Sequence, residues 1–197
     1  GTMTEADGAT PLSGDVCVET YATSTQIGCL GVDPVDGTYT FGPLPAGTYR
    51  VSGNAPDHIE MWFDSVNFPA DPALATPVIV TAGADTSGID FALAPAGSIS
   101  GTVFAADGST PQANIPVDIE GGGYGRCTEA DGSFAINGLP LGTALILHAG
   151  GVGWPECPGG THLQEWWEEA ADPGSADPIT LSLGAGQHVT ARNFTLE

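Results

Sequence analysis

The chain has 197 residues and a net charge of −21, with 24 acidic residues, three arginines and no lysine. This charge excludes nucleic acid and anionic membrane surfaces as expected partners, because both attract proteins through basic residues. No apolar run approaches the roughly 18 residues of a membrane-spanning segment, so we also expect no membrane insertion.

Short strands between turns are predicted along both halves of the chain. Asp-Gly pairs, which favour turns because glycine readily adopts a positive φ, stand at 7–8, 36–37, 107–108 and 131–132. In the first half, apolar or alternating segments predict strands at 16–18, 38–41, 48–51 and 77–81. Turns roughly every 8–12 residues, without a sustained helical period, predict an all-β chain. The acid-rich segment 162–171 is the exception, because it is compatible with a short helix.

The second half of the chain repeats the first. The matching segments are 1–8 and 101–108, 36–41 and 131–136, 44–48 and 139–143, and 91–93 and 194–196. Together with the turn spacing, this duplication predicts two tandem β-sandwich domains, 1–96 and 97–197, each with about seven to eight strands as in an immunoglobulin-like sandwich. The first copy begins where the counterpart of 98–100 is already missing, which suggests a segment of a longer array. The junction at 94–97 leaves little slack, so we expect a semi-rigid pair.

One repeated motif carries a family resemblance. It reads Asp-Gly-Thr-Tyr-Thr-Phe at 36–41 and Asp-Gly-Ser-Phe-Ala-Ile at 131–136, and Leu-Pro-x-Gly-Thr follows in each copy. The motif resembles the carboxypeptidase regulatory-like domain, a transthyretin-like β-sandwich that is similar to the collagen-adhesin B-type repeats of bacterial surface proteins. The resemblance implies a module of secreted proteins, and it is specific for fold rather than for function. A regulatory or folding role beside a metallopeptidase follows from the family name alone.

The four cysteines are expected to provide the crosslinks. Many of the adhesin repeats carry an isopeptide bond from a lysine amine, which a chain without lysine cannot form. Two cysteines fall in each copy, so the simplest assignment is Cys17–Cys29 and Cys127–Cys157, among three possible pairings. Disulfides imply an oxidising compartment. The alternatives are four reduced, buried thiols or, less favoured, a zinc site.

Acidic residues beside the Asp-Gly turns are candidate metal ligands. These are Asp33 and Asp36 in the first copy and Glu129 and Asp131 in the second. Oxygen ligands on turns are typical of calcium sites, although no complete EF-hand spacing is present. The favoured alternative is that these acids are solvated turn residues and that the protein has no cofactor.

Aromatic residues beside polar ones form a second candidate site. In an extended segment, His58 and Trp62 share a face with Glu60, and His162 and Trp166 share the matching face in the second copy. An aromatic platform beside hydrogen-bonding groups suits a sugar ring. The favoured alternative is that these tryptophans pack on the core, because aromatic side chains usually do. The stronger candidates for exposed aromatics are Trp167 and Trp154.

The sequence favours a structural role. We find no nucleophile motif and no cysteine in a basic setting, so we expect no enzyme activity. The main hypothesis is a secreted or cell-surface spacer or stalk, with self-association as an open option, whose partners are neighbouring repeats or domains of the same protein. The alternative hypothesis is an accessory module that binds polysaccharide through its tryptophans, assisted by calcium.

Overall fold

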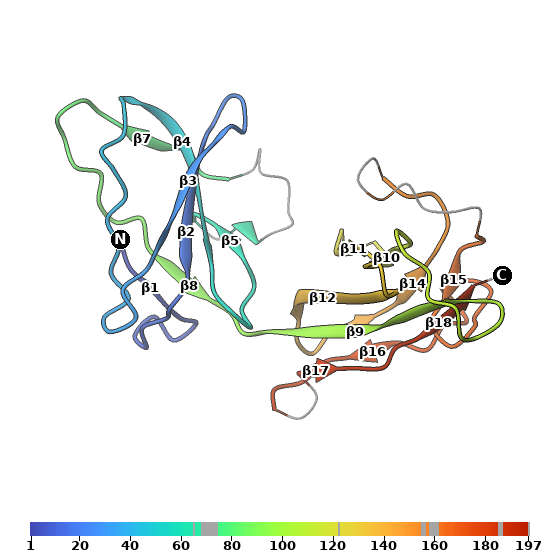
Figure 1. The fold of residues 1–197 in the computed structure, drawn as a ribbon. Coiled ribbons are helices and arrows are strands. Elements are labelled where there is room, and N and C mark those ends of the chain that lie inside the picture. Colours follow the sequence, from blue (N-terminus) through green and yellow to red (C-terminus); the bar gives the residue numbers. More distant parts are fainter. Residues whose placement is uncertain are drawn as a thin grey trace. The chain divides into compact units, whose positions relative to one another are not determined.

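The computed structural model describes residues 1–64, 66–67, 75–121, 123–154, 157, 162–184 and 187–196, with 66–67 described by their backbone alone. The chain forms two compact units, Gly1–Pro95 (unit 1) and Ala96–Glu197 (unit 2). The regular elements of the described ranges are all β-strands, and none is a helix. The predicted all-β fold class is therefore confirmed (Figure 1).

Unit 1 packs a large sheet against a small one. The large sheet has the order β3-β2-β4-β5-β6, with β7 also paired to β4, and the small sheet pairs β1 with β8 in parallel. The core lies between them, where Met3 and Phe91 of the small sheet meet Val16, Val18 and Val51 of the large sheet. The strands are β1 (Met3–Glu5), β2 (Asp15–Thr20), β3 (Gln26–Gly31), β4 (Gly47–Asn54), β5 (Met61–Trp62), β6 (Val66–Asn67), β7 (Val78–Val80) and β8 (Phe91–Leu93).

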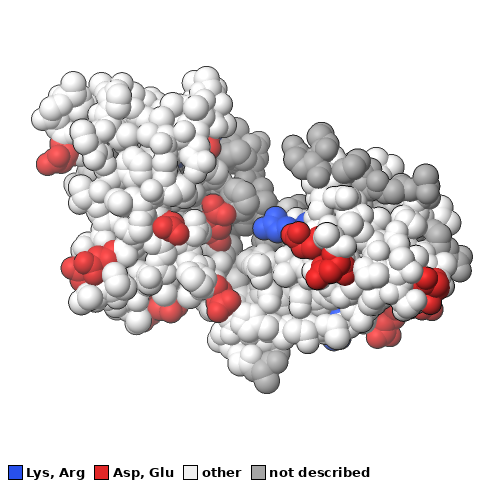
Figure 2. All heavy atoms as spheres, viewed as in Figure 1, with Lys and Arg blue, Asp and Glu red and all other residues white. Residues whose placement is uncertain are grey.

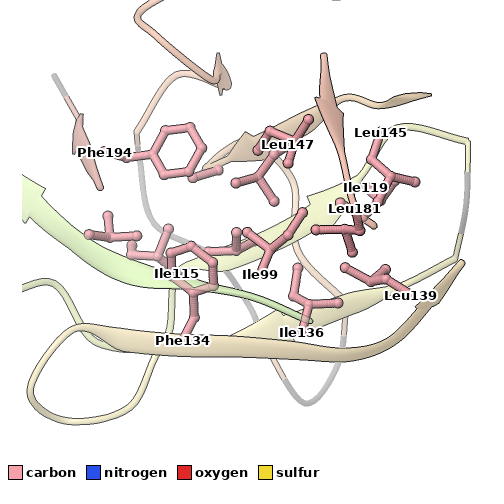
Figure 3. Packing of buried hydrophobic residues seen from close by; sticks show 14 of the residues in the cluster. Ile99, Ile115, Ile119, Phe134, Ile136, Leu139, Leu145, Leu147, Leu181 and Phe194 are labelled. Atoms are coloured by element: carbon pink, nitrogen blue, oxygen red, sulfur yellow. The ribbon is translucent and has the colours of Figure 1, made fainter. Parts of the chain in front are cut away.

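Unit 2 has a related arrangement that is divided among three sheets. One sheet has the order β11-β10-β14-β15, a second has the order β12-β9-β17 with β18 also beside β9, and β13 pairs with β16. Its core includes Ile99, Phe134 and Phe194, packed with Ile136 and Leu147 (Figure 3). The strands are β9 (Ala96–Ala105), β10 (Pro116–Ile119), β11 (Gly125–Cys127), β12 (Ser133–Pro140), β13 (Ala144–Leu145), β14 (Leu147–Ala149), β15 (Glu165–Trp166), β16 (Ile179–Thr180), β17 (His188–Val189) and β18 (Phe194–Leu196).

The described part of unit 2 contains more strands than the predicted seven to eight. β9 to β18 make ten, and several are only two residues long. Part of the difference lies at Ile146, which separates β13 from β14, whereas the corresponding stretch of unit 1 is the continuous strand β4.

The short helix expected at 162–171 is wrong. Trp166 lies in β15 and exchanges backbone hydrogen bonds with Ala170, at 3.3 and 3.1 Å, so the chain turns back on itself within four residues. Glu168 and Glu169 have φ values of 61° and 59°. These left-handed conformations are incompatible with a right-handed helix.

The Asp-Gly turns dock onto the first strand of each unit in the same way. Met3 N donates to Gly37 O at 2.7 Å, and Val103 N donates to Gly132 O at 2.9 Å. Gly37 has a φ of +72°, and a Cβ atom there would stand 2.4 Å from Met3 O. Glycine is required at this turn because it satisfies both the backbone conformation and the close approach.

Candidate functional site

The outer face of the large sheet of unit 1 carries polar residues. Side chains alternate along a strand, and Val16 and Val18 of β2 face the core. Cys17 and Glu19 therefore face outward, as do Arg50 and Ser52 of β4, which pair with Glu19 and Cys17 respectively. Trp62 of β5 extends the same row because it pairs with Ser52.

A hollow of about 310 Å³ opens on this face. Its lining includes the carboxylates of Glu19 and Glu60, the amide of Gln26, the hydroxyl of Ser24 and the ring of Trp62. Burial raises the pKa of the Glu60 carboxyl above its ordinary value, and a hydrogen bond with Ser52 partly offsets the rise. The hollow therefore presents hydrogen-bonding groups beside an aromatic ring, although that ring is only 6% exposed.

A buried ion pair borders the hollow. Arg50 Nη1 donates to Glu19 Oε1 at 2.9 Å and to Ser24 Oγ at 2.8 Å. The guanidinium lies 4.4 Å from the ring centre of Tyr21, within cation–π range. These contacts hold Arg50 in a sheet face where it is only 6% exposed.

Unit 2 has a polar cluster at the matching place. Trp166 of β15 pairs with His148 of β14, as Trp62 pairs with Ser52 in unit 1. Trp166 Nε1 donates to Glu120 Oε2 at 3.3 Å, and the Gln164 amide lies 3.1 Å from His148 Nδ1. His148 Nε2 stands 3.7 Å from the same Glu120 oxygen.

Burial shifts the titration of this cluster. It lowers the pKa of His148, and the nearby Asp118 and Glu120 carboxylates partly oppose that shift. Burial also raises the pKa of Asp118, which pairs with His148 across the sheet. The imidazole is therefore favoured in its neutral form, and a proton on Nε2 would point toward Glu120.

The structure separates several predicted site residues. His58 contacts Glu5 Oε2 through Nε2 at 2.9 Å and Pro56 O through Nδ1 at 2.7 Å, and it does not line the hollow that contains Trp62. His162 is half-buried, and its carbonyl accepts from Gly151 N at 3.3 Å. The expected shared face of histidine and tryptophan is therefore not formed by His58 and Trp62.

The two tryptophans expected to be exposed, Trp154 and Trp167, are half-buried. Trp62 is buried and Trp166 is half-buried, in line with the favoured alternative that these two pack against the protein. Trp167 packs edge-on against Phe194 at 5.7 Å, with the Arg192 guanidinium 5.1 Å from its ring centre. Trp167 therefore packs on the core of unit 2, which is the favoured alternative for such an aromatic side chain.

The candidate calcium ligands lie within their own turns. Asp36 Oδ1 accepts from Thr38 N and Oγ1 at 2.9 and 2.7 Å, and Asp131 Oδ1 accepts from Ser133 in the same way. Asp33 Oδ1 accepts from Val35 N at 2.8 Å. Glu129 takes part in its turn through its backbone, because its N–H donates to Ser133 O and its carbonyl accepts from Gly132 N. Over the described ranges, no three His, Cys, Asp or Glu side chains gather closely enough to hold a metal ion.

Each unit contains one disulfide. Cys17–Cys29 joins directly opposite residues of the neighbouring strands β2 and β3, with a Cα–Cα distance of 4.0 Å. Cys127–Cys157 joins β11 to a residue 30 positions further along the chain, with a Cα–Cα distance of 5.6 Å. Both bonds lie within a unit, which is the pairing that copy membership predicts.

The first and last strands of each unit lie side by side and parallel. In unit 1, β1 pairs with β8, so that Met3 is opposite Phe91. In unit 2, β9 pairs with β18, so that Val103 is opposite Phe194. This pairing could not be predicted from the sequence, because β1, β8 and β18 have only three residues each and show no distinct periodicity.

A side chain fixes the start of each parallel ladder. Asp90 Oδ1 accepts from Thr2 N at 2.7 Å and from Thr2 Oγ1 at 2.9 Å in unit 1. Asn193 Oδ1 accepts from Thr102 N at 2.9 Å in unit 2. The two units therefore share the contact that holds their terminal strands in register.

Comparisons with known proteins give no family. No protein-family model matches the chain, and no curated protein matches it, so the resemblance to the carboxypeptidase regulatory-like domain stays a prediction.

Among solved structures, the chain is similar to the TIE protein of Bacillus anthracis, with 14% identity and a TM-score of 0.31 over the whole of this chain and 33% of that one. The chain thus spans about a third of the TIE protein. It is also similar to a C-terminal fragment of the pilus adhesin SpaC from Lactobacillus rhamnosus GG, with 11% identity and a TM-score of 0.29 over the whole of this chain and 95% of the fragment.

Acidic side chains are spread over the visible surface of both units, with few basic ones among them (Figure 2). Across the described residues, no helix has the length and apolar character needed to cross a membrane.

Proposed function

We propose that the chain is a non-catalytic structural module of a secreted or cell-surface protein, which acts as a spacer that carries tension between its ends. The observation that carries this proposal is the parallel pairing of the first and last strands in both units. The resemblance of the repeated motif to carboxypeptidase regulatory-like and adhesin repeats agrees with such a role. Neighbouring repeats or domains of the same protein would be its partners.

Parallel terminal strands resist pulling because of their geometry. A force on the two ends of a unit pulls β1 and β8, or β9 and β18, in opposite directions along their axes. Every hydrogen bond between the two strands is then loaded at once, whereas an antiparallel pair pulled from one end breaks its bonds one by one. The side-chain contacts of Asp90 with Thr2 and of Asn193 with Thr102 add to this load-bearing ladder.

The disulfides suit an extracellular spacer. Disulfides persist in oxidising compartments, and they limit how far an unfolded unit can lengthen. The closed loops span 12 and 30 residues in sequence. At roughly 3.5 Å per extended residue, the bonds withhold about 4 nm from unit 1 and about 10 nm from unit 2.

Single-molecule pulling tests the spacer proposal. We expect the oxidised chain, held at its N- and C-termini, to unfold in two events, and reduction to add the 4 and 10 nm increments. The matched control moves one handle from the N-terminus to Ser109, which follows the end of β9. Force then acts on the same end of β9 and β18 and peels the ladder apart, so unit 2 should unfold at a clearly lower force. Equal unfolding forces in the two geometries would rule out the load-bearing role.

A second candidate function is carbohydrate binding on the outer sheet faces. The observation that favours it is the repetition of a tryptophan beside carboxylate and amide groups at the same sheet position, with Trp62 beside Glu60 and Gln26, and Trp166 beside Glu120 and Gln164. Such groups suit a sugar, whose ring stacks on an aromatic side chain and whose hydroxyls take hydrogen bonds. Calcium bound at Asp33, Asp36, Glu129 or Asp131 would assist this function.

A glycan array distinguishes the two candidates. The oxidised protein is screened with calcium and again with a chelator. Carbohydrate binding predicts a reproducible signal that Trp166→Ala abolishes while the variant stays folded, with Phe134→Leu as a core-packing control that keeps the signal. Calcium assistance predicts loss of that signal with the chelator. A blank array under both conditions leaves the spacer as the single candidate.

A further inference from the structure

The outer sheet faces of the two units can be compared residue by residue. Ser52 is opposite Trp62 in unit 1, and His148 is opposite Trp166 in unit 2. The two tryptophans are counterparts in the repeat, so Ser52 is the counterpart of His148. The contacts of His148 therefore indicate what the place above Ser52 can hold.

The polar groups on either side of this position also correspond. Glu60 and Gln164 each stand two residues before the tryptophan of their unit. Glu19 and Glu120 each stand two residues after the residue that lies opposite the serine or the histidine. Each unit thus has one glutamate on the neighbouring strand and one carboxylate or amide beside the tryptophan.

In unit 2 the imidazole of His148 bridges these two groups. Its Nδ1 lies 3.1 Å from the Gln164 amide, and its Nε2 lies 3.7 Å from Glu120 Oε2. Unit 2 therefore fills this position with a nitrogen-bearing ring of its own.

In unit 1 the same place is a hollow. Ser52 has a much shorter side chain than histidine, and its hydroxyl bonds the Glu60 carboxylate. The hollow has a volume of about 310 Å³, and its lining includes Glu19 and Glu60 together with Ser52. This volume is at the lower end of the range for small-ligand sites, so it suits a ligand the size of one sugar ring.

The charge of Glu60 favours a cationic ligand. The two basic side chains of unit 1 have other partners, because Arg50 pairs with Glu19 and His58 contacts Glu5. The chain has no lysine, and its two remaining arginines belong to unit 2. Unit 1 thus has no further basic side chain for Glu60. A charge-assisted hydrogen bond from an ammonium group is about twice as strong as one from a neutral donor.

The rest of the lining favours a ligand with several hydroxyl groups. Ser24 contributes a hydroxyl and Gln26 an amide, and both kinds of group can donate as well as accept. A sugar ring offers several hydroxyls to such groups, whereas a lysine side chain offers its ammonium group alone. An amino sugar therefore matches the lining better than a lysine of a partner protein.

We propose that the hollow of unit 1 binds a sugar with a free amino group, such as a glucosamine residue. The ammonium group bonds Glu60 and a ring hydroxyl bonds Glu19, so the ligand bridges the groups whose counterparts His148 bridges in unit 2. The proposal rests on the carbohydrate-binding candidate described above, and it names the class of sugar that this function takes in unit 1.

Titration with three matched monosaccharides tests the proposal. Methyl glucosaminide, methyl N-acetylglucosaminide and methyl glucoside share one ring and differ in the group on its second carbon. Each is added to the full oxidised chain, and the NMR shifts of the Ser52 and Glu60 amides and the Trp62 indole report occupancy. We expect the amine to bind about tenfold or more tightly than the other two sugars, because it alone gives Glu60 a charged donor.

Three variants locate the binding site. Glu60→Gln introduces the residue that unit 2 has at this position, so the variant should fold, and it should weaken binding of the amine by about tenfold or more. Glu129→Gln removes one charge from an exposed position of unit 2 and should leave binding unchanged. Ser52→His copies unit 2, and it should fill the hollow and abolish binding.

The outcomes separate the amino sugar from carbohydrate binding in general. If the three sugars bind equally well, the amino-sugar proposal is overturned while carbohydrate binding in the hollow stands. If Glu60→Gln and Glu129→Gln weaken binding alike, the amine responds to net charge alone, and the proposal is also overturned. If none of the sugars shifts these resonances, carbohydrate binding in this hollow is overturned as well.

Discussion

Arg50 and Glu19 illustrate how a charged residue is kept on the covered face of a sheet. Their side chains are 8% and 18% exposed, and they meet at 2.9 Å. A buried ion pair adds little net stability compared with apolar residues of similar volume, but removal of one partner leaves an uncompensated charge. Removal of one partner should therefore destabilise unit 1 more than replacement of both partners.

This property predicts a difference between single and double substitutions. Glu19→Ala should lower the free energy of unfolding of unit 1 by about 3 kcal/mol, because Arg50 stays buried without its partner. The double variant Glu19→Leu with Arg50→Leu should lose far less free energy of unfolding than the sum of the losses in the single variants Glu19→Leu and Arg50→Leu. Denaturant titration of all variants measures this. Additive effects would show that the pair does not act as a unit.

His148 predicts a pH dependence of unit 2. Its pKa is lowered in the folded state, so below its ordinary value of 6.5 the unfolded chain binds a proton more readily than the folded chain does. Stability should therefore fall as the pH drops from 7 through 6.5 toward the folded pKa. Urea denaturation at pH 7.5 and 5.5 measures the loss. His148→Gln keeps a neutral side chain and should flatten that slope, and an unchanged slope would contradict the assignment.

The Asp-Gly turn at 36–37 anchors β1 in unit 1, because the carbonyl of Gly37 accepts from Met3 N. At Gly37 a Cβ atom would meet Met3 O at 2.4 Å, whereas at Gly8, with a similar φ of +70°, it would meet nothing within 4 Å. The two glycines thus share a backbone requirement and differ in packing. They form a natural pair for comparison.

This comparison predicts unequal costs for the same substitution. Gly8→Ala should cost about 1 kcal/mol for the left-handed conformation alone. Gly37→Ala should cost about 3 kcal/mol, because the new methyl group also displaces β1. Thermal or urea unfolding of both variants provides the measurement. Equal losses would mean that the turn does not support β1.

Sequence patterns predict some elements of the fold better than others. The duplication, the all-β class and the Asp-Gly turns follow from residue order, because each depends on local conformation or on self-similarity. The turn after Trp166 does not, because Glu168 and Glu169 take left-handed conformations that their residue type does not favour.

The candidate site shows the same limit. Trp62 and Trp166 are correctly placed on matching strands, since the repeat alone sets that correspondence. The partners His148, Glu120 and Glu19 were missed, because they come from other strands and meet through sheet register. Alternation along β2 and β4 would have placed Glu19 and Arg50 on one face, but it gives no information about how deeply they are covered.

At the scale of the whole molecule, stability is divided between two units with separate crosslinks. Cys17→Ser with Cys29→Ser should lower the stability of unit 1 by about 3 kcal/mol, and Cys127→Ser with Cys157→Ser that of unit 2 by about 3.5 kcal/mol, from the lengths of the closed loops. Calorimetry of each double variant should show that one transition moves while the other stays. A joint shift of both transitions would contradict independent units.

The parallel pairing of first and last strands also restricts how the chain of a unit can be rearranged. In unit 2 the chain enters β9 at one end of the ladder and leaves β18 at the other. A circular permutation that joins these two ends must therefore return along the length of the ladder. Parallel strands require crossover connections of about a dozen residues or more, so short linkers that suffice for many domains should prevent a permuted unit from folding.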